Sequence, residues 1–471
     1  MLHRVNARVL CLLVVGAVLY AACGPAQPTE EAAPEAAASE QVPAGEEEIP
    51  ASADNPVTLR VGVDMTAPEL ETFMPLLDQV DQAHPEWILV VEQTPQSSAQ
   101  ERLTAAVAAG TLPDVQMMRG LGFNHFMRSG AFLPLDNLIE TYSYPMDDYF
   151  PYILDEWTFQ DQVWGIPNTA APDILSYNTD MFDAAGLAYP DDSWTWDDLR
   201  EAAITLTLDS EGRNPRDPNF DPEHIVQWGY NFNPGALGIW ANSSVVPWGG
   251  DLCADEACTT VSMTDPEDLE ALNWWYNLVV VDHAAVADPF NGANTGVPGD
   301  AFVNGFAAMG GAGYYVIGQI RAVGGFQFGV AQLPEGPAGR ATNLSTTGWG
   351  IAENSQYPDE AFKLIQELTS TEFLRDMWAL PGHSVPARRS AAQSVLTLQG
   401  PPDDLAPVLA VMEYARGFRP NGPAAFEAYF ASYAICSRVF NGEITVEDGY
   451  AQAQEEANAL LTAALEEAGG Q

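Results

Sequence analysis

The stretch that decides the fold is VTLRVGVD, residues 57–64, in which apolar and polar residues alternate as they do in a β-strand. Apolar residues then recur at helical spacing over 70–80, and an apolar run at 87–91 predicts a second strand. A helix over 101–109 is expected to end at Gly110, because glycine favours the left-handed conformation of a helix C-cap. A third strand is expected at 114–118. This alternation predicts an α/β fold with mostly parallel sheets.

Later helices carry start signals of their own. Thr195 stands three residues before Asp198, which is a variant of the capping box. Proline follows Asp265 and Tyr357, in the first helical position that it prefers. Thr445 is predicted to open the last helix. No repeat of fixed period appears, and 471 residues are enough for two or three domains of ordinary size.

Length and charge exclude several classes of function. The chain has 471 residues, of which 47% are apolar, so it can form sizeable cores. It has 18 basic and 65 acidic residues, a net charge of −47, which argues against contact with nucleic acid or with an anionic membrane surface. Lys363 is the only lysine, so a phosphate-binding P-loop is excluded. The excess acid is expected to coat the surface, and a salt-adapted host is one hypothesis that explains it.

The first 22 residues are expected to be a signal peptide. Arg4 and Arg8 precede an apolar run over 9–20 that is too short to span a bilayer comfortably. The sequence AACG at 21–24 resembles the lipobox of bacterial lipoproteins, in which the cysteine is lipidated and becomes the new N-terminus. Cys23 is therefore predicted to carry a lipid anchor. An ordinary secretory signal cut nearby is the alternative, and both place the mature protein outside the cytoplasm.

Residues 23–54 are expected to tether the folded body to a membrane. The segment is rich in Ala, Pro and Glu, contains no basic residue and has few large apolar groups. Such a composition cannot offset the entropy of ordering the chain, and its charge and prolines keep it extended.

The cysteines and histidines form no recognisable catalytic or metal-binding motif. Cys253 and Cys258 flank a short loop, and in an exported chain they are predicted to form a disulfide. Cys436 lies in an apolar helical stretch and is expected to be a buried, inert thiol. No metal-spaced pair, nucleophile elbow or dinucleotide-binding glycine motif occurs, so no metal and no cofactor are expected. A pair of catalytic carboxylates stays open, because a fold can bring distant acids together.

Aromatic residues are the strongest functional signal. Many stand beside Gly, Asn or Ser, as in WAN at 240–242, WGG at 248–250, GYY at 313–315 and GWG at 348–350. Ring faces among small polar residues suit sugars, whose C–H face stacks on a ring while polar side chains bond the hydroxyls. Packing within the core is the alternative for each single ring.

A series of short motifs runs through the body in a fixed order. They are GTLPDV at 110–115, GIP at 165–167, LSYN at 175–178, WTWDDL at 194–199, GGD at 249–251, FAAM at 306–309, FGV at 328–330, WGIA at 349–352, PDEAF at 358–362, and LPG at 380–382 with VPAR at 385–388. In these motifs and their order, the chain from about Asn55 onward resembles the family 1 extracellular solute-binding proteins of bacterial ABC importers, which include the maltose/maltodextrin-binding proteins.

The resemblance implies a periplasmic-binding-protein type II fold. Two α/β lobes are joined by hinge crossings, and the ligand cleft lies between them. Lobe 1 is expected over 55–167 and 335–381, and lobe 2 over 168–334 and 382–471.

The resemblance also implies a site. Asp64, Arg119 and Asn168 lie in three segments that correspond to cleft-lining segments of relatives. Trp240, Tyr315 and Tyr429 fall at or near positions where relatives carry rings that stack on sugar. Trp349 lies at the hinge and is expected to form part of the cleft floor.

The function that these observations favour is a monomeric, lipid-anchored sugar receptor that delivers its ligand to an ABC permease. It is expected to do no chemistry. A receptor for a polyamine or a phosphorylated polyol is the first alternative. The phosphorylated ligand would need several arginines in the cleft, and the sequence offers Arg119 alone. A secreted carbohydrate hydrolase is the second alternative.

Overall fold

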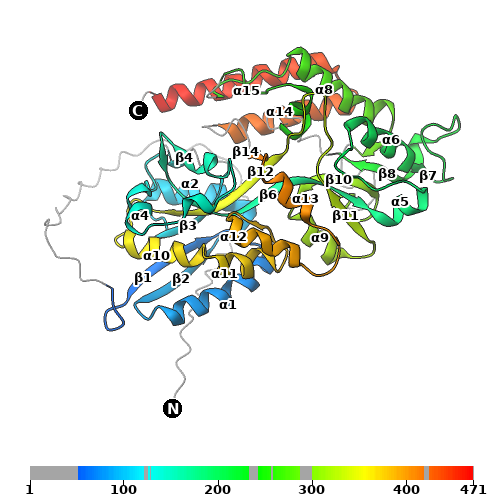
Figure 1. Ribbon diagram of the computed structural model, residues 1–471. Coiled ribbons are helices and arrows are strands. Elements are labelled where there is room, and N and C mark those ends of the chain that lie inside the picture. The colour runs from blue at the N-terminus through cyan, green and yellow to red at the C-terminus, as the bar shows by residue number, and fades with distance from the viewer. Residues whose placement is uncertain are drawn as a thin grey trace, which may run out of the picture.

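The computed structural model describes residues 51–120, 126–127, 129–232, 242–255, 258–286, 300–417 and 424–469. Cys23, Trp240 and nearly all of the predicted tether lie outside these ranges. One long mixed sheet runs through the body in the strand order β2-β1-β3-β12-β6-β10-β8-β7. Helices cover the sheet, and its two outermost strands, β2 and β7, lie at opposite ends of the molecule (Figure 1). The predicted α/β fold is confirmed.

The first part of the chain forms a parallel flank of the sheet. Its elements are β1 (Val57–Val63), α1 (Ala67–Ala83), β2 (Trp87–Gln93), α2 (Ala99–Ala109) and β3 (Val115–Arg119). β1 pairs in parallel with both β2 and β3. Thr66 and Glu69 form a reciprocal capping box at the start of α1, and Gly110 ends α2 with φ +63°. These strands, helices and the glycine cap agree with the predictions from sequence.

Two long strands connect the halves of the molecule. β6 (Ile166–Asn178) pairs antiparallel with β12 (Asn343–Ile351) from Ile166 to Pro172. From Asp173 onward it pairs with β10 and β11. β12 pairs on its other side with β3, so it links β6 to the first flank. The partner change at Pro172–Asp173 therefore marks the place where β6 passes from one half to the other.

The second flank contains β8 (Ile225–Asn231), β10 (Ala307–Gly313) and β11 (Phe328–Ala331). β8 pairs in parallel with β10 and with β9 (Ala285–Val286). The parallel pairing expected from the sequence thus describes most of the two flanks, where, among the described strands, only β7 pairs antiparallel with β8. In the centre, β6 runs antiparallel to its neighbours, and β12 runs antiparallel to β3 and β6. The short strands of the sheet and of a separate hairpin are β4 (Thr158–Phe159), β5 (Gln162–Val163), β7 (Leu208–Asp209), β13 (Val385–Pro386) and β14 (Arg416–Gly417).

The helices begin at the signals read from the sequence. Thr195 and Asp198 form the capping box of α6 (Trp196–Leu206), and proline opens both α8 (Pro266–Tyr276) and α10 (Pro358–Leu368). The remaining helices are α4 (Asp136–Thr141), α5 (Thr179–Ala185), α7 (Asn242–Val245), α9 (Val316–Val323), α11 (Thr371–Leu374), α12 (Arg389–Ala392), α13 (Ala406–Val411), α14 (Ala425–Phe440) and α15 (Val446–Gly469).

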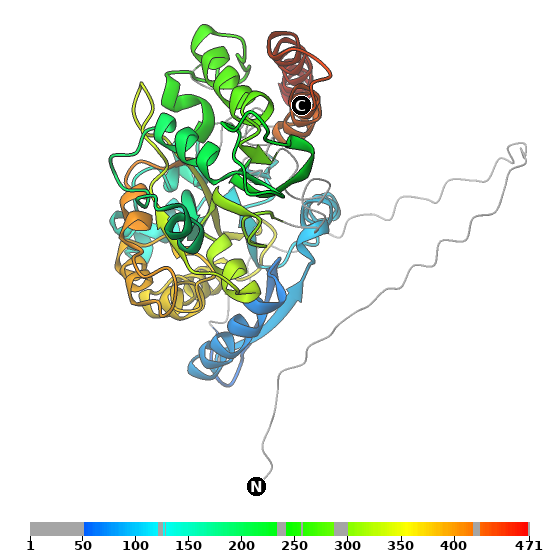
Figure 2. The ribbon, with the colours of Figure 1, turned by 90° about the vertical axis from the view of Figure 1, so that its right-hand side faces the viewer.

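The C-terminal helices lie on the side of the molecule opposite α1. α14 and α15 pack along each other, and α15 also contacts α8. Both views show them at the top, with α1 at the bottom (Figures 1 and 2). Among the described residues, no helix combines the length and the apolar character needed to cross a bilayer.

Two large hydrophobic clusters form the core. The first packs α1, α10 and the central strands together, and includes the ring of Trp349 stacked on Phe73 at 6.2 Å between centroids. The second packs α6, α8, α14 and α15 around Trp196, Trp248 and Trp275. The first cluster also contains side chains from both predicted lobes, for example Ile317 and Leu344. The lobe boundaries at 167, 334 and 381 therefore stay a prediction.

Candidate functional site

Asp64 and Arg119 meet where β1 and β3 end. Gly62 pairs with Gln116 across these parallel strands, so the residues that follow leave the sheet at the same edge. Arg119 Nε donates to Asp64 Oδ2 at 2.9 Å, and Asp64 is only 5% exposed. Burial raises the pKa of the Asp64 carboxyl, and the charge of Arg119 opposes this shift. The structure thus brings together two of the predicted site residues.

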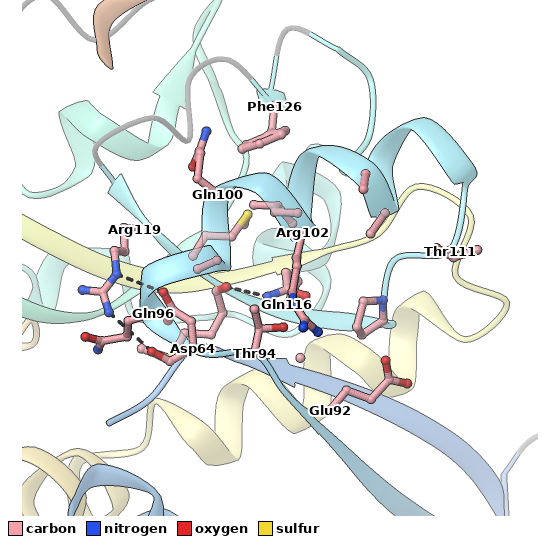
Figure 3. A pocket seen from close by; sticks show the side chains of 18 of the residues that line it. Asp64, Glu92, Thr94, Gln96, Gln100, Arg102, Thr111, Gln116, Arg119 and Phe126 are labelled. Atoms are coloured by element: carbon pink, nitrogen blue, oxygen red, sulfur yellow. Dashed lines mark hydrogen bonds and ion pairs between the residues drawn. The ribbon is translucent and has the colours of Figure 1, made fainter. Parts of the chain in front are cut away.

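A pocket of about 460 Å³ opens from this pair and runs beneath α2 (Figure 3). We call it the α2 pocket; it lies between α2 and the strands β1 and β3. No residue of α2 is fully buried, and the helix touches the sheet through Leu103, Ala106 and Val107, which pack against a small cluster that includes Met118 of β3. Gly62 makes room for the Gln116 side chain, because a Cβ there would collide with it. The volume lies within the range of small-molecule sites.

A row of mostly polar residues lies along β6 and β12, the two strands that connect the halves of the molecule. Thr347 faces Thr169 across β12 and β6, and their hydroxyls are 2.7 Å apart. Alternate residues of a strand share a face, so this row continues along β6 to Ala171 and Asp173 and along β12 to Ser345 and Asn343. Ala171, Asp173 and Ser345 are also the only partly exposed residues of the facing segments 166–173 and 343–351. We call this row, Thr169, Ala171, Asp173, Asn343, Ser345 and Thr347, the crossing stripe.

Asn168 joins the crossing stripe from a bulge. The register shifts after Thr347, where Gly348 pairs with Pro167, so Asn168 is the extra residue on β6. Its amide oxygen accepts a hydrogen bond from the Thr347 hydroxyl. Asn168 is fully buried, so here it supports the crossing strands and presents no surface to a ligand.

Asp173 is the centre of a second polar cluster, at the point where β6 changes partners. Its Oδ2 accepts hydrogen bonds from Asn343 Nδ2 and from the Ser243 hydroxyl, both at 3.1 Å. Burial raises the pKa of the Asp173 carboxyl to about 6, against the effect of these two bonds. Asn231 donates to Asp300 at 2.8 Å in the same half of the molecule. These residues were not predicted from the sequence, although the available signal was that Asp173 is the only charged residue of β6.

Tyr315 provides an accessible ring next to this cluster. The residue is 52% exposed and follows β10, whose Gly313 pairs with Asp173. A Cβ at Gly313 would lie 2.5 Å from the Tyr315 ring, so the glycine allows the ring to lie on the strand. Burial of the hydroxyl, followed by the nearby charges of Asp173 and Asp300, raises the pKa of Tyr315 to about 12.

Tyr429 approaches the same region from α14. It contributes to the raised pKa of Tyr315, which places the two hydroxyls within electrostatic range. Its ring stacks on Tyr433 at 6.2 Å between centroids, and the neighbouring Phe430 is 62% exposed. Two tyrosines from segments more than a hundred residues apart are therefore close enough to influence each other, and Tyr315 is the one that lies beside the carboxylates of Asp173 and Asp300.

The other rings that the sequence singled out have different surroundings. Trp349 is 1% exposed and lies in the core against Phe73, so its expected place on the cleft floor is not available to a ligand in this conformation. Trp248 and Tyr314 are also buried. The small neighbours of these rings serve close packing: at Gly348, a Cβ would lie 2.6 Å from the Ile166 carbonyl oxygen. Trp240 lies outside the described residues.

The cysteines within the described residues agree with the sequence on two points. Cys253 and Cys258 form the predicted disulfide, and Cys436 is buried. The segment after the disulfide is held to α15, because Asn458 and Gln454 accept the backbone N–H groups of Val261 and Met263 at 2.7 Å. Across the described ranges, no three His, Cys, Asp or Glu side chains are arranged to hold a metal ion.

Comparison with known proteins places these features in context. The family model described as bacterial extracellular solute-binding protein matches residues 66–373. The lactose-binding protein of Rhizobium radiobacter is 23% identical over 306 residues, which cover 60% of this chain and 64% of that protein. The alignment thus spans slightly less than two thirds of that relative.

Solved structures share the fold over nearly the whole body. UspC of M. tuberculosis has a TM-score of 0.69 with 25% identity, over 86% of this chain and all of that one. An ABC substrate-binding protein of Listeria monocytogenes, solved with cycloalternan, has a TM-score of 0.72 with 20% identity, over 87% of this chain and all of that one.

Proposed function

Because this chain belongs to the bacterial extracellular solute-binding proteins, which bind substrates and are not enzymes, we propose that it captures a sugar or oligosaccharide between two lobes. It is a solute-binding protein of the ABC-transporter type. The observation that carries the proposal is the half-exposed ring of Tyr315 beside Asp173, at the place where β6 passes from one half to the other. The known sugar-binding proteins of similar fold support it.

The chemistry of these residues suits a sugar. Hydroxyl groups exchange bonds to water for bonds to protein with little net gain, so affinity must come largely from burying the C–H face of the sugar. Tyr315 and Tyr429 supply rings for that face. Asp173, Asn343 and Ser243 supply polar atoms for the hydroxyls, and Asp64 and Arg119 supply more from the other half.

Capture would proceed by closure of the lobes about the crossing strands. In this proposal lobe 1 comprises 55–167 and 335–381, and lobe 2 comprises 168–334 and 382–471. Ligand binds one lobe, the lobes close by a hinge motion, and the closed form docks on the ABC permease.

Location follows from the family and from the N-terminal segment. The family is extracellular, which agrees with a place outside the cytoplasm. We propose further that Cys23 carries a lipid anchor, that residues 23–54 tether the body to the membrane, and that the protein acts as a monomer.

A thermal-shift screen tests the ligand class. The panel contains neutral mono- and oligosaccharides together with spermidine, because Asp173 and Asp300 place carboxylates beside the Tyr315 ring. A ligand at about one hundred times its dissociation constant should add ~2.7 kcal/mol to the free energy of unfolding. A rise in melting temperature with spermidine, and with none of the sugars, would show that the ligand is a polyamine and not a sugar. Binding of a neutral sugar should depend little on salt, whereas binding of a polyamine should weaken strongly.

A further inference from the structure

The α2 pocket has a charge that contrasts with the rest of the chain. The chain carries 65 acidic and 18 basic residues, but the pocket is lined by three arginines, Arg60, Arg102 and Arg119, and by two carboxylates, Asp64 and Glu92. A set of lining residues with the average composition of this sequence would contain more acidic than basic residues. The pocket is therefore a positively charged site on a strongly negative protein, which is the property expected of an anion-binding site.

Two of the three arginines are largely occupied by protein groups. Arg60 forms a two-bond pair with Glu92 at 2.6 and 3.0 Å and also donates to the carbonyls of Leu112 and Thr111. Arg119 donates to Asp64 through Nε and, at 3.5 Å, through Nη2. Its Nη1 group is not used in these bonds and stays available at the end of the pocket where β1 and β3 stop.

Arg102 is the exception. Of all the arginines within the described ranges, its guanidinium alone has no hydrogen bond, ion pair or ring contact with another residue. It projects from α2 and lines the same pocket as Gln116 and Thr94 (Figure 3). In a chain with more than three acids for each base, an exposed arginine without any protein partner is free to bind a group that is not protein.

We propose that the α2 pocket takes the acidic group of an anionic sugar, a carboxylate or a phosphate, with Arg102 as its main partner. This inference rests on the proposed function and narrows its ligand class. Gln100, Gln116 and Thr94 are placed to bond hydroxyls, and Leu103, Met118 and Phe126 give the pocket an apolar side for the sugar ring. The pocket opens at the Asp64–Arg119 pair, so one ligand could extend from beneath α2 into the space between the lobes.

Matched neutral and acidic sugars test the proposal on the full-length protein. The probes are glucose, galactose and maltose, then glucuronate, galacturonate, digalacturonate and glucose 6-phosphate, with glycerol 3-phosphate as an anion without a sugar ring. We expect at least one acidic sugar to bind at least tenfold more tightly than its neutral counterpart in calorimetry. Comparison of the uronates with glucose 6-phosphate then separates carboxylate from phosphate.

Two variants separate the role of Arg102 from the general charge. Arg102→Gln should weaken the acidic sugar by about tenfold to a hundredfold, the worth of a hydrogen bond to a charged group, and should leave neutral sugars unchanged. Arg216→Gln removes the same charge from an exposed pair with Glu201, away from the pocket, and should change neither. Both positions are exposed, so both variants are expected to fold.

Several outcomes would overturn the inference. They are equal binding of acidic and neutral sugars, equal effects of the two variants, and a preference for glycerol 3-phosphate over every acidic sugar. Binding of neutral sugars alone would overturn this inference and leave the proposed sugar receptor intact. Absence of binding by every sugar, neutral or acidic, would overturn the proposed function itself.

Discussion

Asp268 is a buried carboxylate whose removal should stabilise the protein. It lies in the first turn of α8, is 0% exposed, and within the described residues neither of its oxygens has a hydrogen-bond partner. Gly250 leaves just enough room for it, because a Cβ there would collide with Oδ1. Burial, and then the charges of Asp265, Asp251 and Glu267, raise the pKa of Asp268 from 3.8 to about 7.

The sign and the size of the effect follow from this shift. Between pH 4 and pH 7 the folded state holds a proton on Asp268 that the unfolded state has lost, so its contribution favours folding at acid pH and is lost as the pH rises through about 7. A shift of three units corresponds to about 4 kcal/mol at most. An amide at this position would also be buried without hydrogen-bond partners, so we expect roughly half of that gain, about 2 kcal/mol.

Asp268→Asn should therefore be more stable than the parent protein by about 2 kcal/mol at pH 8. The gain should shrink towards pH 5.5, because the parent recovers its proton there. Urea unfolding at the two pH values, followed by tryptophan fluorescence, measures the difference. Asp78→Asn is the control, since Asp78 is exposed on α1. A gain no larger than that of the control at pH 8, or an equal gain at both pH values, would refute the reasoning.

Four further results are expected. Tyr315→Ala should weaken the cognate sugar by about tenfold to a hundredfold in calorimetry with an unchanged melting temperature, because the ring is half exposed. Trp349→Ala should instead destabilise the fold by about 3–5 kcal/mol, and a stable variant with lost binding would show that the ring belongs to the site. Replacing both Cys253 and Cys258 by serine should lower the free energy of unfolding by on the order of 2 kcal/mol. An unchanged free energy of unfolding would show that the disulfide does not stabilise the fold. Cys23→Ser should abolish labelling by palmitate, and equal label in variant and parent would contradict the anchor.

Local patterns in the sequence determined the elements and their ends. The alternation at 57–63 gave β1, the capping pair at Thr195 gave the start of α6, and Gly110 ended α2 where predicted. The disulfide followed from five residues of separation. These features depend on neighbours within one or two turns, where periodicity and backbone preference act, so one sequence is enough to find them.

The surroundings of the site residues were decided by the tertiary structure. Trp349 follows Gly348 directly and Tyr315 stands two residues after Gly313, but the first ring stacks on Phe73 of α1 and the second is half exposed to solvent. Arg60, Arg102 and Arg119 are separated along the chain and meet only because α2 stands above β1 and β3. Whether a ring is buried, or an arginine has no partner in the protein, depends on residues that lie far away in the sequence. A local sequence pattern does not reveal which residues those are.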